Sequence, residues 1–234
     1  MARAALKVPD LEHVEWPAFA ARMQWRQGEH VSLIGPTGGG KTTLALSLLK
    51  ARTYCAVLGC KPDDDVLPGL TKHGFKRTLE LPERGDPPRV LVWPAYREPK
   101  TVRRNVLGRT LTQAFRAGGW TVVADEVSYL TRRLRLEEPL LDLWEQGRSN
   151  KCSFVAATQR PAWVPLAIYS QATHLFLWGT RDGADLSRIG SLNGADPDPI
   201  RAAVANLPRF RALYLNTRTG DMLTTMAPRK IEPR

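Results

Sequence analysis

The sequence has few residues that build disulfides or zinc sites, and it contains no long apolar run. Its 234 residues include 3 cysteines and 4 histidines, and Cys55, Cys60 and Cys152 form no C-x-x-C pair. A disulfide framework and a zinc site are therefore not indicated. No stretch approaches the roughly 20 apolar residues that span a bilayer, and no apolar signal segment follows the N-terminus. We expect a cytoplasmic chain with reduced cysteines and no membrane insertion.

Acidic residues are also in the minority. The chain has 23 Asp and Glu against 34 Lys and Arg, which gives a formal net charge of +11. This excess predicts a polyanionic partner, most simply nucleic acid. The alternative is a basic composition that arises from an arginine-rich genome. The length suits one domain with a sheet covered by helices on both faces.

A glycine-rich segment is the strongest motif. Residues 35–42, GPTGGGKT, fit the phosphate-binding loop G-x-x-x-x-G-K-[ST] between an apolar strand at 31–34 and a helix at 43–49. Glycines let successive backbone N–H groups turn toward a phosphate, and the helix adds its positive N-terminal end. Lys41 is expected to reach the outer phosphates, and the Thr42 hydroxyl to ligate Mg²⁺. The predicted nucleotide-binding residues are Gly35, Pro36, Thr37, Gly38, Gly39, Gly40, Lys41, Thr42 and Thr43.

A second motif supplies carboxylates. Residues 120–126, WTVVADE, read as an apolar strand that ends in two acids, the Walker B pattern. Asp125 would hold Mg²⁺, and Glu126 would polarise the attacking water. Two acids after a strand are common by themselves, but together with the glycine-rich loop they predict an ATPase. ATP and Mg²⁺ are therefore the expected cofactors.

The rest of the pattern predicts an α/β fold with a mostly parallel central sheet flanked by helices. Residues 68–76 read as a loop, and 77–81 as a short edge strand. Further strands are expected at 54–59, 89–93, 151–158 and 173–178, helices at 99–117 and 137–147, and a hairpin at 209–215 and 222–225. The expected divisions are a lead-in with a short helix (1–26), a P-loop ATPase domain (27–226) and a basic tail (227–234).

Residues 147–161, GRSNKCSFVAATQRP, resemble the HerA/FtsK superfamily of P-loop ATPases, which shows a GR…ATQRP pattern here. Residues 169–177 are similar to the strand of that superfamily that begins S-Q-x-T, so the resemblance covers roughly 27–189. It implies an ASCE, RecA-like P-loop NTPase fold in which the strand ending at Thr158 lies between the strands of the two motifs. It also implies that Gln159 contacts the γ-phosphate or its water, and that Arg148 enters the site of a neighbouring subunit. Arg160 is the alternative to Arg148.

Members of this superfamily are ring-shaped, DNA-translocating ATPases. The resemblance therefore implies an ATP-driven translocase of double-stranded DNA that forms a homo-oligomeric ring. The chain lacks the membrane anchor, winged-helix module and N-terminal barrel of the larger pumps, and its size is most like that of phage and viral genome-packaging ATPases. A capsid portal or vertex would then be a further partner, in the host cytoplasm or on the virion. The alternatives are a conjugation or mobile-element pump and a non-motor ATPase switch.

Arginines close to the carboxylate pair are the candidate DNA contacts. Arg132, Arg133 and Arg135 lie one short loop after Glu126, so the nucleotide state could move them. A second basic patch consists of Lys72, Lys76 and Arg77. Both patches could instead be solvated charge. Neither a base-reading helix nor an aromatic stacking platform is evident, which predicts sequence-independent binding to the phosphate backbone.

Overall fold

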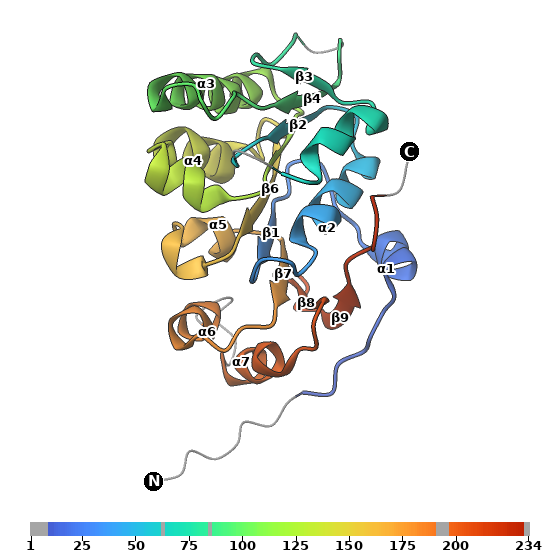
Figure 1. The fold of residues 1–234 in the computed structure, drawn as a ribbon. Helices are drawn as coiled ribbons and strands as arrows, with labels where there is room; N and C mark the ends of the chain where they lie inside the picture. Colours follow the sequence, from blue (N-terminus) through green and yellow to red (C-terminus); the bar gives the residue numbers. More distant parts are fainter. Residues whose placement is uncertain (1–8, 62–63, 84–85, 191–196, 232–234) are drawn as a thin grey trace.

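A mostly parallel sheet organises the chain (Figure 1). The computed structural model describes residues 9–61, 64–83, 86–190 and 197–231, so residues 1–8 of the predicted lead-in and 232–234 of the predicted tail lie outside the described residues. The nine strands found there have the order β3-β4-β2-β5-β6-β1-β7-β8-β9. All neighbouring pairs from β3 to β7 are parallel, and β8 and β9 add an antiparallel edge.

The elements alternate between strand and helix along much of the chain. The strands are β1 (Val31–Ile34), β2 (Cys55–Leu58), β3 (Lys76–Thr78), β4 (Arg89–Val92), β5 (Thr121–Ala124), β6 (Ser153–Thr158), β7 (His174–Trp178), β8 (Arg211–Asn216) and β9 (Met222–Met226). The α-helices are α1 (Trp16–Arg22), α2 (Lys41–Leu48), α3 (Lys100–Ala117), α4 (Glu137–Gln146), α5 (Ala167–Ser170), α6 (Gly183–Gly190) and α7 (Pro197–Asn206). Shorter helical turns are η1 (Leu49–Ala51), η2 (Leu67–His73), η3 (Tyr129–Arg133) and η4 (Pro161–Trp163).

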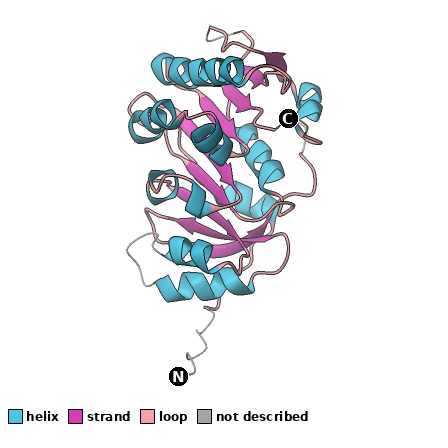
Figure 2. Cartoon of the chain, turned by 60° about the vertical axis from the view of Figure 1, so that its left-hand side comes forward, coloured by secondary structure: helices cyan, strands magenta, loops and turns pink. Residues whose placement is uncertain are grey.

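Helices cover both faces of the sheet (Figures 1 and 2). Helices α3 to α7 contribute to one hydrophobic core, whereas α1, α2 and η2 contribute to the core on the other face. The central strands are buried along their whole length, and their side chains alternate between the two cores. In β5, for example, Val122 and Ala124 join the first core and Val123 joins the second. Burial on both faces explains why these strands read as continuous apolar runs.

The predicted fold class is confirmed, and so is the position of β6 between β1 and β5. The β8–β9 hairpin is also present as predicted. The predicted loop at 68–76 is wrong, because the 3-10 helix η2 occupies most of it. Buried Leu67 and Leu70 share one face of η2, and Asp64 Oδ1 accepts hydrogen bonds from the first amides, those of Val66 and Leu67, at 2.8 and 2.9 Å. The predicted edge strand is shorter than expected.

Sheet topology fixes where chemistry can occur. Gly35 N–H, which follows β1, donates to the Thr158 carbonyl at the end of β6 at 3.1 Å. Asp125 follows the adjacent strand β5, so the carboxyl ends of β1, β5 and β6 meet at one edge. This edge is the usual ligand-binding edge of an open parallel sheet. No helix of the described residues has the length and apolarity to cross a bilayer.

His30 lies just before β1 and makes the stability of the fold depend on pH. Its ring stacks on Trp144 with centroids 4.6 Å apart, and its Nδ1 accepts a hydrogen bond from the Phe154 amide at 3.0 Å. Burial lowers the pKa of His30 to about 4. The unfolded chain therefore takes up a proton on this group before the folded chain does. The stability present above the unfolded pKa, roughly 6.5, is lost as the pH falls toward 4.

We predict that His30→Gln flattens this pH dependence. Between pH 7 and pH 5, linkage at His30 removes about 2 kcal/mol from the free energy of unfolding of the wild type, whereas glutamine cannot titrate. Urea unfolding of both proteins at the two pH values measures the difference. Equal losses in the two proteins would contradict this role of His30.

Candidate nucleotide-binding site

The glycine-rich loop runs from the end of β1 to the start of α2, as its sequence predicts. Two of its glycines are required by close approaches of other segments. A Cβ atom at Gly35 would lie 2.4 Å from Trp178 Cβ, and one at Gly40, whose φ is 94°, would lie 2.7 Å from Ala227 Cβ. Side chains at these positions would displace the loop from β7 and from the C-terminal segment.

Lys41 is the first residue of α2 and is almost fully buried. Its ammonium donates to the carbonyls of Gly35 and Pro36 at 2.7 and 2.8 Å. Burial lowers the pKa of Lys41 to about 8, and the nearby Glu126 carboxylate opposes that shift. A bound triphosphate would supply the negative charge that this buried cation lacks.

Asp125 lies at the carboxyl end of β5, where only 1% of its side chain is exposed. Burial raises the pKa of Asp125, and the ammonium of Lys61 acts against this shift. The Lys61 Nζ atom lies 2.7 Å from Asp125 Oδ2 and 3.5 Å from Asp64 Oδ2. The motifs do not include Lys61; its signal in the sequence is a lysine between the end of an apolar strand and three aspartates.

Glu126 is held by side chains from two elements. Its Oε1 accepts hydrogen bonds from Ser128 Oγ at 2.7 Å and from Thr158 Oγ1 at 3.3 Å. Thr158 ends β6, and the next residue, Gln159, lines the same cavity as Lys41 and Asp125. The structure therefore brings the predicted carboxylates, Lys41 and Gln159 together at one edge of the sheet.

A cavity of about 590 Å³ opens between the loop and the C-terminal segment. Its polar end contains Lys41, Thr42 and Asp125, and the hydroxyl and carboxylate oxygens of the last two suit Mg²⁺. A mainly apolar wall of the cavity comes from the residue before β8, the end of β9 and the residues after β9. These wall residues are Phe210, Met226, Ala227, Pro228 and Arg229. Both the volume and the two-part lining fit a nucleotide with its metal ion.

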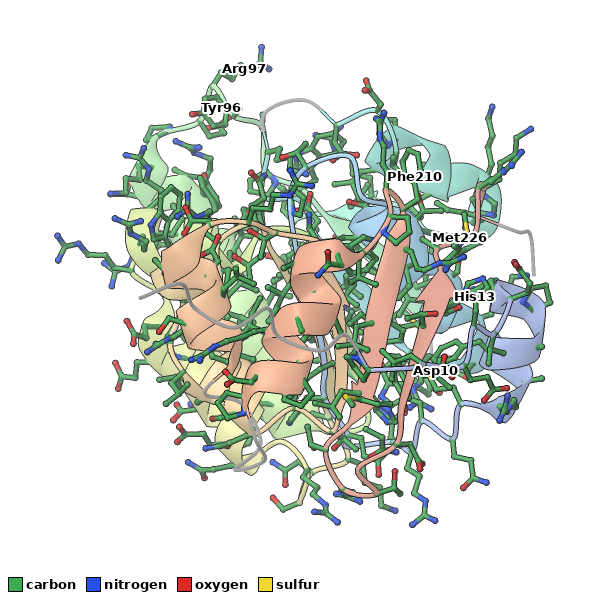
Figure 3. The ribbon with its side chains drawn as sticks, turned by 90° about the horizontal axis from the view of Figure 1, so that it is seen from below. Asp10, His13, Tyr96, Arg97, Phe210 and Met226 are labelled. Atoms are coloured by element: carbon green, nitrogen blue, oxygen red, sulfur yellow. The ribbon has the colours of Figure 1, made fainter. Side chains whose placement is uncertain are left out.

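The wall of the cavity was not predicted from the sequence. Phe210 and Met226 lie at neighbouring ends of β8 and β9 (Figure 3). Phe210 is 42% exposed, and the Arg209 guanidinium lies 4.7 Å from its ring centroid. Ala227, Pro228 and Arg229 belong to the segment that the sequence assigns to a basic tail. An exposed aromatic ring beside a phosphate loop is a suitable surface for a nucleobase.

Arg148 lies at the amino ends of the parallel strands, whereas the cavity lies at their carboxyl ends. It is exposed in the turn before β6, where the Cys152 amide donates to the Gly147 carbonyl at 2.8 Å. The six residues of β6 separate this turn from Gln159, which follows β6 and lines the cavity. At 3.3 Å per residue, that separation is roughly 20 Å. Arg148 therefore cannot reach the cavity of its own chain.

Arg160 is engaged within its own chain. Its guanidinium pairs with Asp182 at 3.0 Å and with buried Asp185 at 3.0 Å. It also lies 5.3 Å from the centroid of the Trp163 ring. These contacts make Arg160 a poorer candidate than Arg148 for insertion into a neighbouring subunit.

The predicted DNA contacts are exposed. Arg132 and Arg133 belong to the π-helical turn η3, and Arg135 follows it. The Arg132 guanidinium lies 4.8 Å from the centroid of the Trp163 ring, which is 50% exposed. The second patch lies at the β3 edge of the sheet, where Lys72, Lys76 and Arg77 are exposed.

Two exposed aromatic residues modify the prediction that no stacking surface is present. Trp163 is one of them. The other is Tyr96, which is 53% exposed and lies with Arg97 in the loop after β4, pointing away from the molecule (Figure 3). The Arg103 guanidinium lies 4.4 Å from the Tyr96 centroid and donates to the Tyr129 hydroxyl at 2.6 Å. Aromatic rings that carry guanidinium groups are common on nucleic-acid-binding surfaces.

The sheet order and the loop between β1 and α2 define the class: the chain has the α/β fold of a P-loop NTPase. Its structure matches those of HerA/FtsK-type ATPases. The genome packaging NTPase B204 from Sulfolobus turreted icosahedral virus 2, solved with ATP-gammaS, matches with a TM-score of 0.64 at 17% identity over 86% of this chain and 98% of that chain.

Two further solved structures are also similar. VirB4 of Thermoanaerobacter pseudethanolicus has a TM-score of 0.65 at 10% identity over 88% of this chain and 90% of its own. EccC of Thermomonospora curvata, solved with a signal sequence peptide, has a TM-score of 0.56 at 15% identity over 86% of this chain and 37% of its own. At these identities the likeness establishes the fold. No protein-family model and no curated protein matches the sequence.

We predict that Phe210→Ala weakens ATP binding about tenfold, because among the described lining residues Phe210 supplies the aromatic ring that could pack on the base. Binding of inorganic triphosphate, which has no base, should not change. Titration calorimetry with both ligands measures the two affinities. Tyr96→Ala, which removes an exposed ring that does not line the cavity, is the matched control. An unchanged ATP affinity in Phe210→Ala would exclude Phe210 from the base contact.

Proposed function

We propose that this chain is an ATPase that moves double-stranded DNA as part of a ring of its own copies, and that it packages a viral genome. The proposal rests on one observation: the predicted catalytic residues lie in two groups, one at the carboxyl ends and one at the amino ends of the parallel strands. Lys41, Asp125, Glu126 and Gln159 meet at the carboxyl edge, whereas Arg148 is exposed at the amino edge. A ring that places the amino edge of one subunit against the cavity of the next completes the set.

The residues at the cavity have distinct tasks in hydrolysis. Lys41 and the loop amides bind the phosphates, and Thr42 and Asp125 would hold Mg²⁺, whose charge would neutralise the phosphate oxygens. Glu126, positioned by Ser128 and Thr158, orients and polarises the attacking water, and Gln159 contacts the γ-phosphate or that water. Arg148 from the neighbouring subunit stabilises the charge of the transition state, which is worth roughly 10³–10⁵ in rate for an inserted arginine.

A route from the cavity to the DNA runs through Trp163. Gln159 precedes Arg160, whose guanidinium lies beside the Trp163 ring, and Arg132 lies beside the same ring. Arg132 and its neighbours in η3 follow Glu126 after a short segment. A shift of Glu126 or Gln159 on hydrolysis would therefore move the exposed arginines that contact the phosphate backbone.

The similarity to B204, a genome packaging NTPase of nearly the same length, supports the viral setting. A conjugation or mobile-element pump with the same fold is the second candidate. Empty capsids or portal rings distinguish the two. Stimulation of ATP hydrolysis by capsids supports packaging, whereas no response to capsids together with activity on DNA alone supports a transfer pump.

We predict that Arg148→Ala binds ATP with wild-type affinity but hydrolyses it at least about 10³-fold more slowly. Adding Glu126→Gln subunits should restore hydrolysis, because they supply Arg148 to the intact cavities of the first variant. Phosphate release from each variant and from the mixture is the measurement. Arg116→Ala, an exposed arginine at the same edge, is the control. A mixture no more active than its components would refute a shared site.

We predict that replacing Arg132, Arg133 and Arg135 by glutamine weakens binding to double-stranded DNA of any sequence. The slope of log K against log salt should fall by about 1 for each phosphate that the variant no longer binds. Fluorescence anisotropy over a range of salt concentrations measures this slope. The control replaces Arg104, Arg109 and Arg116, three exposed arginines of α3, and so removes the same charge. Equal weakening in both triple variants would show that net charge, rather than this patch, binds DNA.

A further inference from the structure

Lys61 is a second lysine in the nucleotide cavity, and no motif accounts for it. It follows the end of β2, the strand next to β5, and it lines the cavity together with Lys41, Thr42 and Asp125. Its ammonium lies 2.7 Å from Asp125 Oδ2. Within the described residues, Lys61 is the one cation that forms an ion pair with Asp125.

The surroundings of Lys61 hold its backbone in place and leave its side chain room to move. The Trp93 indole N–H donates to the Lys61 carbonyl at 2.9 Å. The side chain is 36% exposed, in contrast to the 1% exposure of Asp125. Asp64 Oδ2 offers a second carboxylate at 3.5 Å, and Asp64 is itself fixed by the Val66 and Leu67 amides. The ammonium therefore has two carboxylate partners, of which only one is a predicted metal ligand.

A buried carboxylate needs a counter-charge. Without a cation, Asp125 would be an ionised group in an almost water-free position, which is strongly unfavourable. Lys61 supplies one positive charge to the carboxylate that Mg²⁺ would use, and Mg²⁺ would supply two. The two cations would compete for the same carboxylate, because Nζ is already at ion-pair distance from Oδ2.

We propose that Lys61 is a built-in counter-ion for Asp125 that keeps Mg²⁺ from this carboxylate until ATP binds and that moves to Asp64 when Mg²⁺ and ATP enter together. This inference rests on the proposed ATPase function. Lys61 thereby suppresses binding of Mg²⁺ alone and makes metal binding depend on the additional negative charge of the triphosphate. It is a positioning residue that acts through Asp125.

The decisive variant is Lys61→Met, which keeps the aliphatic stem and removes the charge. In the absence of nucleotide, millimolar MgCl₂ should raise the melting temperature of Lys61→Met by at least about 3 °C and leave the wild type unchanged. Lys61→Arg should behave as the wild type. Lys151→Met, which removes an exposed lysine at the opposite edge, is the control. The same response to MgCl₂ in Lys61→Met and the wild type would overturn the proposal.

A double variant keeps the test valid if Lys61→Met folds poorly. Lys61→Met combined with Asp125→Asn has no buried charge to compensate, so it should melt at a higher temperature than Lys61→Met and show no response to MgCl₂. If Lys61→Met has no cooperative transition and the double variant does not recover one, Lys61 supports the fold independently of Asp125, and the proposal is wrong.

A nucleotide-binding experiment distinguishes failure of the Lys61 inference from failure of the proposed ATPase function. With a fluorescent ATP analogue, the Mg²⁺ concentration that gives half-maximal binding should be about tenfold lower for Lys61→Met than for the wild type. Equal concentrations in both proteins would overturn the role of Lys61 and leave the ATPase intact. If neither protein binds the analogue, the proposed function fails, whereas melting with MgCl₂ still reports on the competition at Asp125.

Discussion

The site depends on one constraint of the sheet, the parallel pairing of β5, β6 and β1 as neighbours. This pairing brings the residues after each strand to a common edge, and it sets Glu126 beside Thr158 and the glycine-rich loop beside both. If β6 paired elsewhere, Gln159 and Thr158 would leave the site although every motif remained in the sequence. The chemistry therefore follows from strand order as much as from the motifs.

The same constraint separates Arg148 from the cavity. In a parallel sheet, the amino ends of the strands lie on one side and the carboxyl ends on the other. A residue before β6 therefore lies on the side opposite the residue after β6. Within one chain, this separation leaves the catalytic site without Arg148. In a ring, Arg148 of one subunit would contact the site of the next subunit. Exposure of Arg148 and the engagement of Arg160 with Asp182 and Asp185 both favour this arrangement.

Local patterns were enough to predict the α/β class and the polar end of the cavity, whereas the place of β6 between β1 and β5 was predicted from the resemblance to a known superfamily. The loop at Gly35, the acids after β5 and the buried strands each have a signature that spans fewer than about ten residues. Phe210 and Ala227 have no such signature, because their places follow from how β8 and the C-terminal segment converge in space. The 3-10 helix η2 was not predicted because its only sequence features are two buried leucines, Leu67 and Leu70, and the hydrogen bond that Asp64 accepts at its start.

The central claim is that hydrolysis requires a neighbouring subunit and is stimulated by DNA. The most direct measurement is the ATP hydrolysis rate per subunit over a range of protein concentrations, with and without double-stranded DNA of unrelated sequences. The account predicts a rate per subunit that rises with concentration until rings form and that increases further with DNA of any sequence. A rate per subunit that is constant at all concentrations and insensitive to DNA would contradict it.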